Sequence, residues 1–283
     1  YRPAIGKCAP YKPDYLDYDL WCGPAPAEPL TRPKLHYDWH WVWSTGDGDM
    51  GNSTVHPFDA CRMFMPGRAF PQRVVSLGGR FTYDDAAQTP NTQFTLLDFP
   101  GLPIVIENRN LPMEKIEADA KRSEVVMDQF RRIREGIVLQ YEGGYFAGLR
   151  AGGVVLDKDN KEVKRFQGDG GAGHQANFIK AVRSRKTGDL HAPIAEGHVS
   201  SAVCHLSNLS YRLGRPGKVS ACQDALGKHA PVAEGFPRLV KSLEGIGVDL
   251  DKTPFTLGPW LELDPASGDI VKVGAGDAAQ LEQ

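Results

Sequence analysis

Three polar side chains on one predicted helix face are the first candidates for chemistry. Asn52, His56 and Asp59 have the spacing i, i+4 and i+7, so on an α-helix their side chains project from the same face. An imidazole titrates near neutral pH, and a nearby amide or carboxylate can fix its tautomer while it exchanges a proton with a substrate hydroxyl. A satisfied surface histidine gives the same spacing, and on spacing alone that interpretation is favoured. Pro57 would bend the helix beside His56.

The segment that must position this helix is rich in aromatic residues and glycine. "HYDWHWVW", residues 36–43, alternates in the manner of a strand from Trp39 to Trp43, and the loop "TGDGDMGN" then leads into a helix that begins near Asp49. His36 and His40 lie four residues apart, but a strand places no carboxylate or thiol beside them. A zinc site is therefore disfavoured, and we interpret both histidines as hydrogen-bonded core or pocket residues.

Two other motifs are rejected from their context. Gly168, Gly170 and Gly173 satisfy G-x-G-x-x-G, but a dinucleotide fingerprint needs a buried apolar strand before it and a second strand after the helix. The preceding "KEVKRFQ" is charged, so a loop before a helix is predicted there. The sequence has no G-x-S-x-G motif and its five cysteines include no C-x-x-C pair. We interpret them as reduced, mostly structural thiols and predict no metal ligand.

The remaining elements predict the fold class. Short β segments separated by Gly, Pro and Asn turns, without long helices between them, indicate an antiparallel or mixed sheet. The predicted strands lie within residues 73–83, 92–99, 102–110, 136–150 and 151–159. Helices are predicted at 173–186 and 194–215 from their apolar spacing, with an insertion helix at 114–136. The predicted fold is α+β: a large, mostly antiparallel or mixed open-faced sheet with helices packed on one face.

Composition limits the class of protein and its domains. The 283 residues suit one large or two small domains. A net charge of -2 gives no electrostatic attraction to nucleic acid, and no apolar run is long enough to span a bilayer. Residues 1–35 contain seven prolines and are predicted to form an extended connector before a single domain at 36–283. Because the chain opens in this segment, we expect upstream sequence, including any export signal, and leave the cellular location open.

At the candidate residues the sequence resembles a known family. "WHWVWSTGDGDMGNSTVHPFDACRMF", residues 39–64, is similar to the part of Gfo/Idh/MocA oxidoreductases in which a tryptophan, a glycine cluster and D-x-x-x-H-x-x-D follow one another. The resemblance continues in the same order over nearly the whole chain. It is carried by "DYDLWCGPAPAEPL", "GGRFTYDDAAQTPNTQ", "HQANFIKAVRSRK", "AEGHVSSAVCHLSNLSYRLGR" and "FTLGPWLELDP".

The resemblance implies the C-terminal, substrate-binding half of a two-domain enzyme. NAD or NADP is then expected in an N-terminal domain that these residues lack, and no cofactor is expected in this chain alone. The family histidine maps onto His56 as the general acid–base at a sugar hydroxyl or carbonyl, and Asp59 matches the last carboxylate of the motif. Asn52 stands where the family has an aspartate, which implies an amide that binds or orients substrate.

The aromatic segment is interpreted as part of a carbohydrate pocket. Indole faces stack on the C–H faces of sugars, and imidazoles meet hydroxyls. Trp39, His40 and Trp41 are the candidates, and on a strand His40 would face away from the two tryptophans. The leading hypothesis is an oxidoreductase acting on sugars or polyols. The alternatives are an NAD-dependent glycosidase that uses transient oxidation, and a non-catalytic carbohydrate-binding or oligomerisation domain. We also expect a homo-oligomer formed through the sheet face.

Overall fold

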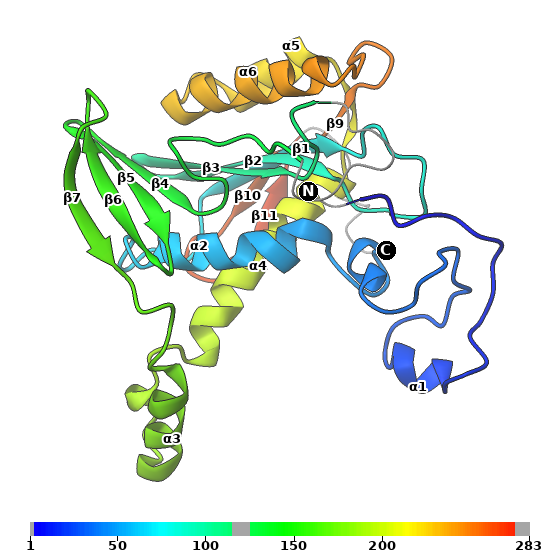
Figure 1. The fold of residues 1–283 in the computed structure, drawn as a ribbon, viewed down its shortest axis with the longest axis horizontal. Helices are drawn as coiled ribbons and strands as arrows, with labels where there is room; N and C mark the ends of the chain where they lie inside the picture. Colours follow the sequence, from blue (N-terminus) through cyan, green and yellow to red (C-terminus); the bar gives the residue numbers. More distant parts are fainter. Residues whose placement is uncertain (1–2, 115–124, 275–283) are drawn as a thin grey trace. The chain divides into compact units, whose positions relative to one another are not determined.

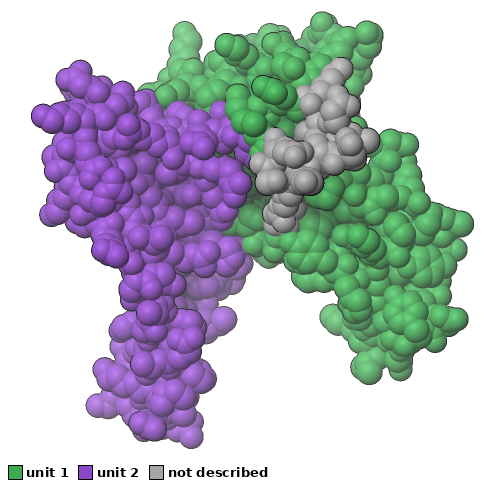
Figure 2. Space-filling view, viewed as in Figure 1, with its two compact units in different colours: residues 1–54, 69–126, 204–283 green, residues 55–68, 127–203 purple. Residues whose placement is uncertain are grey.

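The computed structural model describes residues 3–114 and 125–274. They divide into two compact units, which Figure 2 colours separately. Unit 1 comprises residues 1–54, 69–126 and 204–283, and unit 2 comprises residues 55–68 and 127–203. The chain thus enters unit 2 twice and returns to unit 1 after each passage.

Unit 1 is built on a seven-stranded sheet whose strand pairs are all antiparallel. The strand order is β11-β10-β1-β2-β3, with β9 pairing β1 and β8 pairing β9. The strands are β1 (Arg73–Gly79), β2 (Thr92–Phe99), β3 (Leu102–Arg109), β8 (Arg215–Gly217), β9 (Phe255–Leu257), β10 (Leu261–Leu263) and β11 (Ile270–Val273). β1 and β2 are buried almost throughout, as expected of central strands with both faces covered.

Two helices cover one face of this sheet, α5 (Val219–Leu226) and α6 (Ala230–Gly245), as Figure 1 shows. Side chains at alternate strand positions, such as Leu77 and its neighbour Phe94, point to that face. The rings of Phe94 and Phe236 meet there at 5.7 Å between centroids. Gly235 lets α6 approach closely, since a Cβ at that position would lie 3.1 Å from the Phe94 ring.

The opposite face of the same sheet meets α4 (Ile194–Arg212), whose residues from Cys204 onward belong to unit 1. Gln93 on β2 donates a hydrogen bond to Asn208 on α4, and Ser210 accepts one from the backbone N–H of Ser76. Ahead of the sheet, residues 3–35 contain one short helix, α1 (Tyr18–Cys22), within otherwise irregular chain.

Unit 2 contains a four-stranded antiparallel sheet in the order β4-β5-β6-β7. Its small core consists of Tyr145, Ala147 and Leu156. The strands are β4 (Ile137–Tyr141), β5 (Gly144–Leu149), β6 (Gly152–Asp157) and β7 (Glu162–Gln167). The helices are α2 (Val55–Arg62), α3 (His174–Ser184) and the first half of α4, with a 3₁₀ turn, η4, at Thr187–Asp189.

The α+β class with an open, antiparallel sheet is confirmed, and so are the strands predicted between residues 73 and 159 and the helices α3 and α4. The prediction that helices pack on one face is corrected, because α5 and α6 cover one face of the seven-stranded sheet and α4 meets the other. The insertion helix predicted at 114–136 is wrong where it can be checked. Residues 115–124 lie outside the described part of the chain, and residues 125–136 form turns and one isolated bridge between Phe130 and Ile133.

None of the helices in the described residues combines the length and apolar character needed to cross a bilayer.

Candidate functional site

The aromatic segment is a helical turn, so the strand predicted from Trp39 to Trp43 is wrong. Residues Asp38–Trp41 form a 3₁₀ helix, η1, and the rings of Trp39 and His40 stack at 3.7 Å between centroids. Adjacent side chains of a strand point to opposite faces and could not stack in this way. The contacts of Tyr37 with the His40 and Trp41 rings add to the cluster. Local aromatic packing therefore outweighs the alternating pattern.

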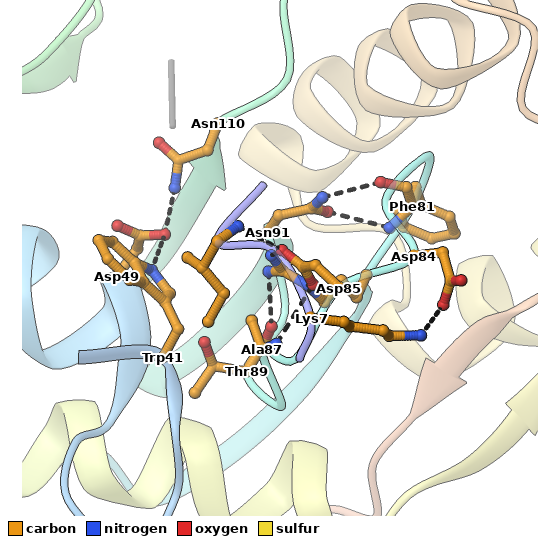
Figure 3. Close-up of polar contacts among 12 residues, drawn as sticks. Lys7, Trp41, Asp49, Phe81, Asp84, Asp85, Ala87, Thr89, Asn91 and Asn110 are labelled. Carbon is orange, nitrogen blue, oxygen red and sulfur yellow. Dashed lines mark hydrogen bonds and ion pairs between the residues drawn. The ribbon is translucent and has the colours of Figure 1, made fainter. Parts of the chain in front are cut away.

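The three candidate pocket residues in this turn differ in exposure. Trp41 is buried, and its indole N–H donates to the carboxylate of Asp49 at 3.2 Å. The Asn110 side-chain amide donates to the same carboxylate, as Figure 3 shows. Trp39 and His40 are half-buried, so their stacked rings are partly accessible.

The helix predicted to begin near Asp49 does begin there, but its first turn is a π-helix, η2 (Met50–Thr54). The α-helical spacing used to align Asn52 with later residues does not hold across a π turn, so that part of the prediction is corrected. Thr54 fixes the end of the turn by donating to the side chain of Asn108 on β3 at 2.7 Å. Single π turns within helices occur frequently at functional sites. Asn52 is half-buried in this turn and belongs to unit 1.

His56 and Asp59 lie one turn apart on α2, in unit 2. His56 is exposed, and within the described residues its imidazole makes no hydrogen bond or ion pair. Asp59 accepts a hydrogen bond from the Ser200 hydroxyl of α4 at 2.5 Å. Arg62 donates to the same hydroxyl at 2.9 Å and to the Glu196 carboxylate at 2.8 Å. The carboxylate of Asp59 thus holds α2 against the first half of α4.

Unit 1 contains a histidine–carboxylate pair that the sequence does not predict. The Nδ1 atom of His205, on α4, lies 3.5 Å from a carboxylate oxygen of Asp47 in the glycine-rich loop. Asn208, one turn further along α4, donates to the backbone carbonyl of Asp47 at 2.7 Å. The helical spacing of His205 and Asn208 was available in the sequence, but nothing local pairs them with a loop so distant along the chain.

Three of the five thiols do not have the properties of nucleophiles. All five cysteines are free. Burial raises the pKa of Cys61 to about 11 and that of Cys222 to about 12. Burial and, to a smaller degree, the charge of Asp47 raise the pKa of Cys204 to about 12. These thiols are protonated near neutral pH, when only a thiolate would act as a nucleophile.

The glycine motif does not fit a dinucleotide. Gly168, Gly170 and Gly173 follow β7, a strand exposed at every residue and paired antiparallel to β6. The fingerprint requires a buried parallel strand before the turn, so the pyrophosphate cradle is missing. The described residues also contain no group of three or more His, Cys, Asp or Glu side chains that could hold a metal ion.

Part of the chain matches a family model. Residues 7–133 match the C-terminal alpha/beta domain of the Gfo/Idh/MocA oxidoreductases. The resemblance to this family is thus confirmed over these residues. The matched range contains the aromatic segment, the glycine-rich loop, η2 and α2. A comparison with curated proteins found no match.

Solved structures similar to this chain are distant. A protein from Thermotoga maritima assigned as an oxidoreductase has 12% identity and a TM-score of 0.43, over 62% of this chain and 49% of that one. The WlbA dehydrogenase from Bordetella pertussis, in complex with NADH and UDP-GlcNAcA, has 17% identity and a TM-score of 0.36, over 64% of this chain and 49% of its own. The chain spans about half the length of these structures. Likeness at this level carries no argument about function.

Proposed function

We propose that this chain is the substrate-binding half of an NAD(P)-dependent oxidoreductase that acts on sugars or polyols. The observation that carries the proposal is the family match over residues 7–133. It supports an oxidoreductase domain, and it includes the residues to which the family motif assigns proton transfer and substrate contact. The substrate class is the finer part of the proposal.

In this proposal His56 is the general acid–base. Its exposed imidazole has no competing partner within the described residues, so a ring nitrogen can meet a substrate hydroxyl. Asp59 is a positioning residue, because its bond to Ser200 fixes the helix that carries His56. Asn52 offers an amide that can accept from one hydroxyl and donate to another.

The stacked rings of Trp39 and His40 are proposed as the sugar-binding surface. The indole face of a tryptophan suits the apolar face of a pyranose, and imidazole nitrogens suit its hydroxyls. Trp41 supports this surface from below as a core residue, since its ring is buried and its N–H is bonded to Asp49.

A nicotinamide dinucleotide would supply the hydride acceptor. The glycines at 168–173 do not fit it, for the reason given above, so we propose that it is held by residues outside this chain. The role left to the described residues is to bind and orient the sugar and to move a proton at its hydroxyl.

Sugar binding by the 283-residue chain is the direct test of the proposal. UDP-GlcNAcA, glucose and myo-inositol would be titrated by isothermal calorimetry. At least one is expected to bind, and Trp39→Ala is expected to weaken it by about 3- to 10-fold, the usual worth of an aromatic contact. Trp21→Ala is the matched control, because Trp21 stacks on Tyr18 in the N-terminal segment. Equal affinities for the wild type and Trp39→Ala would remove the aromatic surface from the proposal.

A further inference from the structure

A buried polar network in unit 1 holds one loop carboxylate in place. Gln93 donates to Ser76 at 3.0 Å and to Asn208 at 3.3 Å, and Asn208 in turn donates to the backbone of Asp47 at 2.7 Å. Ser76 also bonds to Thr95 at 2.8 Å. These four side chains are 96–100% buried. Fully satisfied buried networks rigidify the groups that they contact. This network therefore fixes the backbone of Asp47, in the glycine-rich loop, against α4.

Two glycines near Asp47 leave room for its carboxylate and for the loop backbone. A Cβ at Gly51 would lie 1.8 Å from a carboxylate oxygen of Asp47, closer than any real contact allows. Gly46, on the other side of Asp47, passes so close to the backbone of His40 that a Cβ there would lie 2.6 Å from its carbonyl oxygen. The two glycines therefore permit the conformation in which Asp47 faces α4.

His205 is the exposed residue that this carboxylate faces. Its neighbours Cys204, Leu206 and Asn208 are buried, whereas its own side chain is 63% exposed. The Nδ1 atom faces Asp47, so the Nε2 atom is left for a ligand. A carboxylate behind one ring nitrogen fixes the tautomer that presents an unprotonated second nitrogen to an incoming hydroxyl.

We propose that Asp47 and His205 form a ligand-binding pair, in which the Nε2 atom of His205 accepts a hydrogen bond from a hydroxyl of the sugar or polyol. No covalent bond changes in this contact: the ligand hydroxyl donates to Nε2, and the Asp47 carboxylate, which faces Nδ1, holds the ring in the tautomer that accepts. His205 is the residue that meets the ligand, and Asp47 is its positioning residue. The chemistry of this ligand rests on the proposed function, but the orientation of the pair does not.

The ¹⁵N chemical shifts of the histidine rings in the 283-residue chain test the orientation without any ligand. For neutral His205 the account predicts the tautomer protonated on Nδ1. In Asp47→Asn the Nε2-protonated form is expected to rise, because an amide can donate to Nδ1. Gly51→Ala is expected to have the same effect, since the new methyl displaces the carboxylate. Gly197→Ala is the control on α4, as no atom lies within 4 Å of its Cβ position. Unchanged tautomers in both Asp47→Asn and Gly51→Ala, in folded protein, would overturn the pair.

Ligand addition tests the second half of the proposal. The sugar that binds in calorimetry is expected to shift the Nε2 resonance of His205, and His205→Gln to weaken it by about 2- to 10-fold, the range of one hydrogen bond. A sugar whose affinity depends on Trp39 but that leaves the His205 resonances and the His205→Gln affinity unchanged would refute the pair while preserving the proposed function. If none of the sugars binds to the wild-type chain, the sugar ligand is refuted for the proposed function and for the Asp47–His205 pair.

Discussion

A buried carboxylate ties the start of unit 1 to the loop between β1 and β2. The side chain of Asp85 is fully buried, and it accepts hydrogen bonds from Arg80 at 2.5 and 2.7 Å, from the Ile5 N–H at 2.8 Å and from the Ala87 N–H at 3.2 Å. Its neighbour Asp84 is 93% exposed and pairs with Lys7 at the surface (Figure 3). Two adjacent aspartates thus have opposite environments.

We predict that Asp85→Asn lowers the free energy of unfolding by about 3 to 5 kcal/mol, because it leaves the Arg80 guanidinium buried without its charge partner. Asp84→Asn is the control and should change stability by less than about 1 kcal/mol, since exposed ion pairs contribute little. Urea unfolding at pH 7 measures both. Equal effects of the two substitutions would contradict the assignment.

The same residue predicts part of the acid response. Burial raises the pKa of Asp85, but the bonds from Arg80, Ile5 and Ala87 outweigh it and leave the pKa below its ordinary value of 3.8. A lowered carboxyl pKa stabilises the folded state above pH 3.8, and this contribution disappears as the pH falls through the folded pKa. Unfolding free energies measured from pH 6 downward should therefore fall less steeply for Asp85→Asn than for the wild type. Parallel curves would show that Asp85 contributes nothing to the acid response.

The residue-scale chemistry could be predicted from the sequence only in part. The spacing and the family motif singled out His56, and the exposed imidazole is compatible with the proposed role. The bond from Ser200 to Asp59 and the pairing of Asp47 with His205 could not be predicted, because both join residues that lie far apart in the chain. No spacing rule connects such positions.

At the scale of elements, strands were easier to predict than turns. β1 and β2 bury nearly every residue, and the order of β1, β2 and β3 in the chain is their order in the sheet. The η1 segment has an alternating sequence that predicts a strand, but the stacking of the Trp39 and His40 rings favours a helical turn. Helix α6 was not predicted, since Pro237 and two glycines interrupt a sequence whose Phe236, Leu239 and Leu243 have helical spacing.

The two glycines of α6 give a matched test of its packing. We predict that Gly235→Ala destabilises unit 1 by about 1 to 3 kcal/mol, because the methyl group would collide with Phe94 and with Glu107, which Arg238 holds in place. Gly245→Ala meets no atom within 4 Å and should stabilise the helix by up to about 1 kcal/mol. Thermal unfolding measures the difference. A stabilising Gly235→Ala would show that α6 does not approach the sheet as closely as described.

At the scale of the whole molecule, exposed aromatic residues favour the self-association expected from the sequence. In unit 2, Phe146 on β5 contacts Phe64 at 6.0 Å and Phe166 on β7 at 6.4 Å between ring centroids. Phe64 and Phe166 are each about half exposed, at 53% and 47%. Apolar sheet surface of this kind is usually covered by a partner, and we propose a second copy of the chain.

Light scattering of the purified chain at micromolar concentration should therefore show a dimer or larger oligomer. Phe166→Glu is expected to shift the oligomer toward monomer, because it places a charge among the rings of Phe64 and Phe146. Val163→Glu, on the same strand but outside the three phenylalanine rings, is expected to leave the oligomer unchanged. A monomeric wild-type chain would contradict the proposal. Equal dissociation by the two variants would show that the interface on β7 is not centred on the phenylalanine rings.

Steady-state turnover tests whether His56 moves the proton in the proposed oxidoreductase. NAD(P)H formation from the sugar or polyol would be followed in a preparation that includes the nucleotide-binding part of the enzyme. His56→Ala is expected to lower kcat by about 10² to 10⁴, the usual contribution of a positioned acid–base, with nucleotide affinity nearly unchanged. His191→Ala, which changes an exposed histidine outside the motif, is expected to retain activity. Full turnover by His56→Ala on a substrate that the wild type oxidises would contradict the account.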